Sequence, residues 1–211
     1  MTYKVVRSNR KTICICVSSE NEVTVRCPMK ISDKKIDEFV KSKREWLLKV
    51  LYTNELKLSE NESITQYKEI FVTGVKLPLI IGMQNELTAS AVYVKDLKEV
   101  KNLFISVFGS NFIRFVESVS LQCNLFVNKI DIKSYKRRWG CCDRNGKITF
   151  NYMIFMLPQS LQRYVVVHEL CHTAFFNHSS EFWKLVERFE PEYKKLRKQL
   201  NGFSFVTNLY K

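Results

Sequence analysis

The chain has 211 residues, of which 34 are lysine or arginine and 21 are aspartate or glutamate, giving a formal charge of +13. Its 45% hydrophobic residues, six glycines and four prolines indicate a globular protein and exclude disordered and collagen-like classes. The first thirty residues contain no apolar stretch typical of a secretory signal. The most apolar long segment, 102–127, carries Arg114 and Glu117, so we expect no membrane span and no membrane partner.

Seven cysteines form an odd set without a Cys-x-x-Cys pair. A chain of this size needs no disulfide framework, so a reducing compartment, the cytoplasm, is the expected location. Cys14 and Cys16 lie two residues apart in an expected strand. We interpret them as small buried hydrophobic residues rather than a redox pair, because period-2 neighbours share a face without meeting.

Residues 1–95 are predicted to form a β-rich N-terminal lobe with one helix. Alternating β-branched segments separated by turn-forming residues predict an antiparallel sheet at the start of the chain. Ser32 is the expected cap of an amphipathic helix, and the polar residues 57–65 predict a loop. The expected strands are 3–7, 11–17, 22–28, 69–74, 76–82 and 91–95.

Residues 96–200 are predicted to form a mostly helical catalytic lobe, followed by a tail over residues 201–211; one continuous domain is the alternative. Gly109-Ser110 is expected to divide a long helical segment in two, and Asn145-Gly146 to turn a loop between two strands. The fold class is therefore α+β. The expected elements are helices at 96–109 and 111–127, strands at 130–135 and 147–151, and helices that begin at Pro158, at Ser179 or Ser180, and at Pro191.

All three histidines lie within eleven residues, and the first two form the motif His168-Glu169-Leu170-Cys171-His172. Residues four apart lie on one face of a helix, so His168 and His172 can converge on one ion at about 2.0 to 2.1 Å. Catalytic zinc sites use three protein ligands, and His178 becomes available if the helix ends in a left-handed turn at Asn177. The sequence therefore predicts one Zn²⁺ held by the three histidines, with other divalent metals as alternatives.

The third ligand has a rival. A downstream carboxylate can replace His178, which then becomes a helix cap or a substrate contact. A purely structural metal site is disfavoured because such sites are closed and rich in cysteine. The rival carboxylates are Glu181, Glu187, Glu190 and Glu192.

Glu169 follows the first metal ligand by one residue, about 100° round the helix. From there it can reach metal-bound water without binding the metal, which predicts a general base. The expected chemistry is hydrolysis at a carbonyl or phosphoryl centre.

The residues around this motif resemble the YgjP-like metallopeptidase family, predicted metal-dependent hydrolases of the zincin superfamily. The resemblance is dense from Lys133 to Trp183 and looser over the N-terminal strands. It implies a zincin-like fold with a small sheet, an active-site HExxH helix and a third ligand downstream. Cys141 replaces the serine of the family's usual Trp-Gly-Ser-Cys loop. The matching residues are Arg138-Trp139-Gly140-Cys141-Cys142, 146–151, Pro158, 164–172, Asn177-His178-Ser179 and Phe182-Trp183.

Arg138 and Trp139 precede Gly140, which permits close backbone approach. This combination suits either support of the site or the lining of a substrate groove. The spacing does not identify the group that stabilises an oxyanion, for which Arg138 and Tyr152 are candidates.

Three functions remain open, and a zinc metallopeptidase acting on a peptide or protein is the one we expect. Residues 133–147 contain six basic residues and one acid, which favours an anionic substrate and a zinc-dependent nucleotide pyrophosphatase, a phosphoanhydride hydrolase, as the alternative. The third is a nucleic-acid-associated metalloprotease, although no RNP, zinc-finger or helix-turn-helix pattern supports it.

Overall fold

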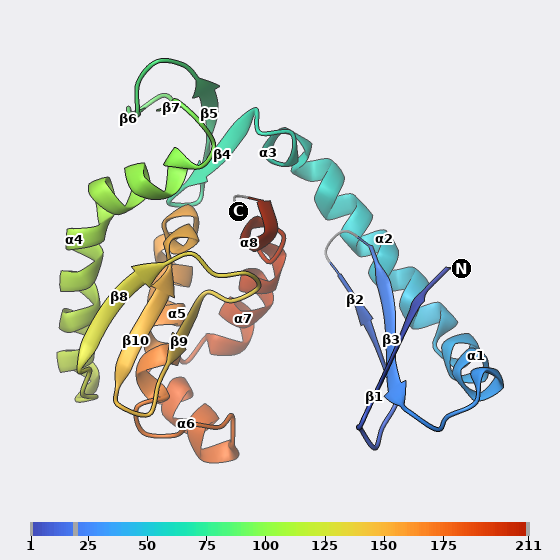
Figure 1. Cartoon of the computed structure of the whole chain (residues 1–211). Helices are drawn as coiled ribbons and strands as arrows, with labels where there is room; N and C mark the ends of the chain where they lie inside the picture. Colours follow the sequence, from blue (N-terminus) through green and yellow to red (C-terminus); the bar gives the residue numbers. More distant parts are fainter. Residues whose placement is uncertain (1, 19–20, 210–211) are drawn as a thin grey trace. The chain divides into compact units, whose positions relative to one another are not determined.

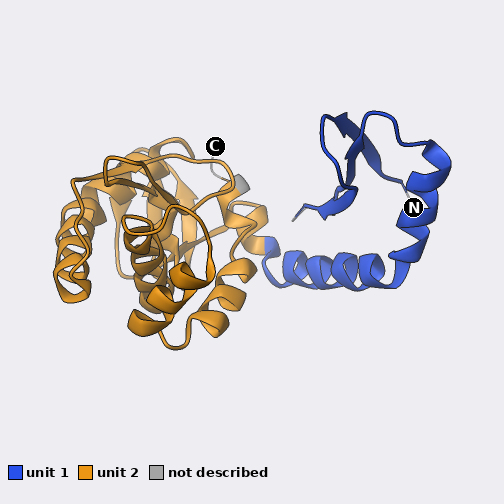
Figure 2. Cartoon of the chain, turned by 90° about the horizontal axis from the view of Figure 1, so that it is seen from below, with its two compact units in different colours: residues 1–62 blue, residues 63–211 orange. Residues whose placement is uncertain are grey.

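The computed structural model describes residues 2–18 and 21–209. The chain divides into two compact units, residues 1–62 and 63–211 (Figure 2). This division falls earlier than the boundary at residue 95 expected from the sequence. The reason is that buried side chains of residues 70–94 share one hydrophobic core with the helices that follow them.

Unit 1 contains a three-stranded sheet whose central strand is the most buried. Its order is β1 (Lys4–Ser8), β3 (Val23–Pro28), β2 (Cys14–Val17) (Figure 1). Strands β2 and β3 are antiparallel, but β1 and β3 are parallel, so the prediction of an all-antiparallel sheet is wrong for β1. The chain reverses twice between β1 and β3, so pairing β1 with the free edge of β3 makes the two strands run the same way.

The helical part of unit 1 begins where the sequence predicts, because the Ser32 side chain accepts the Lys35 N–H at 3.4 Å. The predicted single helix is divided at Lys43 into α1 (Asp33–Ser42) and α2 (Arg44–Glu60). At the division, the Ser42 hydroxyl donates to the Phe39 carbonyl at 2.7 Å and competes with the helical hydrogen bonds.

The predicted loop over residues 57–65 is wrong, because α2 continues to Glu60 and α3 (Glu62–Thr65) follows. The segment is polar, but leucine, lysine and glutamate are strong helix formers, so polarity alone did not indicate a loop. The interpretation of Cys14 and Cys16 is also wrong: Cys14 is half-buried, Cys16 is exposed, and their Sγ atoms lie 3.9 Å apart. All seven cysteines are free thiols.

Unit 2 contains two small sheets. The β4–β5 hairpin and β7 confirm the three predicted strands, and the short β6 is an addition. The predicted turn at Asn145-Gly146 exists, with Gly146 at φ +74°, but it joins β10 to β9, a strand that the sequence did not reveal. In spatial order, the strands of the first sheet are β4 (Glu69–Val72), β5 (Val75–Ile81), β7 (Val92–Val94) and β6 (Glu86–Leu87). Those of the second sheet are β8 (Lys129–Lys133), β10 (Lys147–Asn151) and β9 (Gly140–Cys142).

One long helix, α4 (Glu99–Cys123), replaces the two predicted helices. Gly109 lies buried in its middle, where an added Cβ would be 3.7 Å from the Ile132 Cδ1. A glycine costs a helix about 1 kcal/mol, whereas burial of one side chain such as Phe104 or Phe112 contributes about 1.5 to 3 kcal/mol. Packing therefore carries the helix through Gly109 to a left-handed end at Asn124 (φ 51°).

The remaining helices enclose the core of unit 2, and the expected α+β fold class is confirmed. Phe205 and Val206 are buried in that core, so the segment expected as a tail packs onto it. Among the described residues, no helix has the length and apolarity needed to cross a membrane. These elements are the 3-10 helix η1 (Tyr152–Met156), α5 (Gln159–Cys171), α6 (Ser180–Phe189), α7 (Tyr193–Gly202) and α8 (Val206–Leu209).

Gly74 holds the β4–β5 turn against the start of α5. Its φ is +90°, and an added Cβ would lie 2.7 Å from the Pro158 Cγ. We expect Gly74→Ala to lower the free energy of unfolding by about 1 to 3 kcal/mol, measured by urea titration. Gly82→Ala is the matched control, because nothing lies within 4 Å of an added Cβ there. Equal unfolding midpoints for the two variants would contradict this account.

Candidate metal centre

Helix α5 carries the first part of the site and ends earlier than predicted. It stops at Cys171, and His172 is its C-cap residue. The predicted left-handed turn at Asn177 is wrong, because Asn177 is absent from the described non-glycine residues with positive φ. The chain bends back sooner because the His172 Nδ1–H donates to the Phe175 carbonyl at 2.9 Å. The Asn177 side chain instead accepts the Ser179 N–H at 3.3 Å.

The three histidines converge in space. Their ligand-capable atoms all lie within 4.8 Å of one another, and His168 Nε2 lies 3.2 Å from His178 Nε2. Two nitrogens that each lie 2.0 to 2.1 Å from a tetrahedral ion are about 3.3 Å apart. The hydrogen bond at His172 Nδ1 leaves its Nε2 for a ligand bond, in the way that backbone carbonyls commonly orient metal-binding imidazoles. The donor set therefore fits one divalent ion.

The rival carboxylates are not part of this cluster. Among residues 2–18 and 21–209, the metal-capable group contains the three histidines and no acid. Glu190 pairs with Arg163 at 2.7 Å, and Glu187 lies 3.8 Å from the Lys194 Nζ. The structure therefore brings His178, rather than a carboxylate, to the other two imidazoles.

Aromatic rings from α6 pack against the imidazoles. Phe182 stacks on His172 with centroids 4.5 Å apart and planes at 26°, and Trp183 stacks on His178 at 5.5 Å and 22°. Trp183 also stacks on Tyr193 of α7 at 5.3 Å. Ser179 begins α6, as predicted, by accepting the Phe182 N–H. The N-terminus of α6 thus fixes the imidazole of His178, which lies outside α5.

Burial favours the neutral, metal-binding form of His168 and His172. It lowers the pKa of His168 to about 3, and the charges of His172, His178 and Arg197 act in the same direction. Burial is also the main cause of the lowered pKa of His172. Neutral imidazole is the ligand form, so at neutral pH a proton does not compete with an ion for these two histidines.

Glu169 is only 6% exposed and lies beneath strand β9, which the sequence did not reveal. A Cβ on Gly140 of β9 would lie 2.8 Å from its Cγ and 3.0 Å from its Oε1. Burial raises the pKa of Glu169 to about 8, while the charge of Arg138 lowers it. A carboxylate buried in this way is stabilised by nearby positive charge. The close approach expected at Gly140 is therefore an approach to Glu169.

A cleft of about 460 Å³ exposes part of this arrangement. Of the residues singled out from the sequence, Arg138, Trp139 and Gly140 line it together with His168, Glu169 and His178. Tyr152 does not line it: this residue is 2% exposed in the core, and burial raises its pKa. Residues that the sequence reasoning missed also line the cleft, namely Tyr164, Val165, Arg197, Leu200 and Asn201.

Only the fold reveals these additional residues. Arg197 follows two lysines and precedes a third in the sequence, and no local motif distinguishes it from these neighbours. In the structure its guanidinium lies over the Trp183 ring, 4.8 Å from the centroid. Cys141, the departure from the family's loop, has its thiol 3.4 Å from the Tyr135 hydroxyl.

An HExxH helix with a third histidine beside a buried glutamate, on an α+β fold, is the arrangement of a metal-dependent peptidase. The family model described as YgjP-like, metallopeptidase domain matches residues 11–203, and the chain belongs to this family. The resemblance seen in the sequence is thereby confirmed.

The crystal structure of the metallopeptidase zymogen of Pyrococcus abyssi abylysin aligns with a TM-score of 0.39 at 24% identity, covering 42% of this chain and 90% of that chain. No curated protein matches the sequence.

The stacking of Trp183 on His178 should orient this imidazole for metal binding. We expect Trp183→Ala to weaken Zn²⁺ binding about tenfold, because the imidazole of His178 loses the ring that orients it. A competition titration with a chromophoric chelator measures the affinity. Trp46→Ala, at an exposed position of α2, is the control and should bind Zn²⁺ like the parent protein. Identical dissociation constants for both variants would show that the stack does not position the ligand.

Proposed function

We propose that this protein is a zinc-dependent peptidase in which His168, His172 and His178 hold the ion and Glu169 is the general base. The observation that carries the proposal is the convergence of three imidazoles, two of which, His168 and His178, line one cleft together with the buried Glu169. We also propose the cytoplasm as its compartment, in keeping with seven free thiols.

When bound, the ion supplies Lewis acidity and lowers the pKa of water. The Glu169 carboxylate accepts the proton of the attacking water and then donates it to the leaving amine of the peptide. Arg138 supports the first step, because its positive charge favours the ionised form of Glu169. Gly140 holds Glu169 in place, since no larger residue fits against its side chain.

A specific observation keeps the phosphoanhydride hydrolase as a second candidate. Arg138 and Arg197 both line the cleft, and neither forms an ion pair with an acid among the described residues. Each guanidinium instead lies over an aromatic ring, Tyr135 or Trp183. Arginines free of carboxylate partners can bind phosphate or the carboxylate of a peptide. No comparable observation favours a nucleic-acid partner.

The assignment of the base is tested by Glu169→Gln. We expect this variant to bind zinc like the parent protein and to lose turnover by about 10²-fold or more, because the amide cannot accept the proton. Zinc content by elemental analysis and kcat on the best substrate are the two measurements. His172→Ala is the comparison and should lose both zinc and activity. Full turnover by Glu169→Gln would refute its role as base.

A paired substrate screen separates the two candidate reactions. The zinc-loaded protein should cleave peptides in a casein digest, with loss of activity after chelation and recovery after zinc is restored. Nucleoside triphosphates should release no pyrophosphate under the same conditions. Pyrophosphate release without peptide cleavage would select the second candidate instead.

A further inference from the structure

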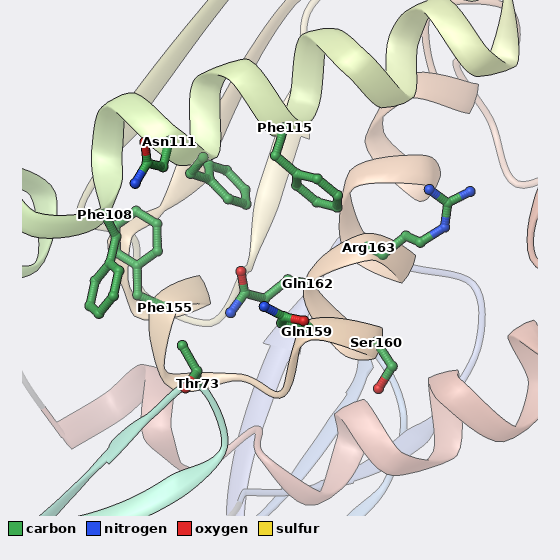
Figure 3. Close-up of a pocket in the computed structure, with 10 residues that line it drawn as sticks. Thr73, Phe108, Asn111, Phe115, Phe155, Gln159, Ser160, Gln162 and Arg163 are labelled. Carbon is green, nitrogen blue, oxygen red and sulfur yellow. The ribbon is translucent and has the colours of Figure 1, made fainter. Parts of the chain in front are cut away.

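Unit 2 contains a second concavity that shares no lining residue with the metal centre (Figure 3). Its volume is about 580 Å³, within the range of small-molecule sites. It lies between α4, the 3-10 helix η1, the β4–β5 turn and the first turns of α5. The chemistry proposed above uses none of its residues.

Four phenylalanines make its walls predominantly apolar. Phe112 and Phe155 meet edge to face at 5.4 Å, Phe108 lies 5.3 Å from Phe155, and Phe115 lies 6.2 Å from Phe112. These mutual contacts fix the rings. The pocket is therefore preformed rather than opened by a ligand, and its walls suit an aromatic body.

One side chain of the lining, that of Gln162, has an acceptor with no donor from the described part of the protein. Gln162 is only 9% exposed, and its Nε2 donates to the Leu157 carbonyl at 2.8 Å. That bond fixes the orientation of the carboxamide, and among the described residues no donor reaches its Oε1. Figure 3 shows the carboxamide directed into the space between Phe108 and Phe115. This oxygen can therefore accept a hydrogen bond from a donor on a molecule that enters the pocket.

The rim carries no free charge. Arg163 is the charged residue of the lining, and its Nε lies 2.7 Å from the Glu190 carboxylate. Its Nη1 also donates a hydrogen bond to the side-chain Oε1 of Gln122 at 3.3 Å. Because this cation is already compensated, the pocket offers no excess charge to attract an ion.

We propose that this pocket is a second binding site, for an uncharged small molecule with an aromatic body and one hydrogen-bond donor that reaches the Gln162 Oε1. The site does not depend on the proposed peptidase chemistry. It is nevertheless connected to it physically, because Gln162 and His168 lie on the same helix, six residues or about 9 Å apart along its axis.

The test uses indole and 1-benzothiophene, two bicyclic molecules of similar shape of which only indole has an N–H donor. Each is titrated into the ¹⁵N-labelled full-length protein and followed by amide chemical shifts. We expect saturable binding of indole, with shifts at Thr73 and Phe115 and none at the Trp183 side chain. Benzothiophene should bind about fivefold more weakly, because it leaves the Gln162 acceptor unpaired.

Gln162→Met keeps the shape of the side chain and removes the acceptor. It should weaken indole binding about fivefold, to the level of benzothiophene, and leave benzothiophene unchanged. Gln199→Met, at an exposed position of α7, is the control and should change neither affinity. If Gln162→Met does not fold, Phe115→Ala replaces it and should weaken both probes.

Three results would overturn the proposal. The first is the absence of saturable binding by either probe. The second is binding that shifts the Trp183 side chain instead of Thr73 and Phe115. The third is an indole affinity that is unchanged in Gln162→Met, or unchanged in Phe115→Ala if that variant is used.

Discussion

The close approach of strand β9 to helix α5 is the constraint on which the site depends. Glu169 is largely buried beside the imidazoles, and its side chain faces the backbone of Gly140 where β9 meets α5. A side chain at Gly140 would overlap Glu169 and displace either the strand or the carboxylate. The same approach brings Arg138 and Trp139 to the cleft, so one glycine links the placement of Glu169 to the wall of the cleft.

The histidines depend on a second arrangement, the packing of α6 against the end of α5. His168 and His172 share α5 and its C-cap, but His178 reaches them only because the chain bends after His172 and the rings of Phe182 and Trp183 hold the imidazoles. One helix and its C-cap therefore position two of the three histidines, whereas tertiary packing positions the third. Arg197, which belongs to α7, lies beside the site because its guanidinium packs over the Trp183 ring.

Several sequence predictions failed where tertiary packing outweighed a local signal. Gly109 indicated a helix break, but the apolar residues on either side of it are buried against the core, and α4 continues. Strand β9 was missed because three residues that include a glycine and two cysteines carry no strand pattern of their own. The parallel pairing of β1 with β3 likewise depends on which edge of β3 is free, and no segment of sequence records this.

The sequence by itself determined the features that depend on near neighbours along the chain. The helical spacing of His168, Glu169 and His172, the cap at Ser32 and a serine cap at residue 179 or 180 follow from the geometry of one turn of helix. Only the tertiary structure decided that Gly140 touches Glu169, that Arg197 enters the cleft, and that Tyr152 lies in the core. These outcomes depend on contacts between segments far apart in the chain, whose pairing is set by the packing of the whole core.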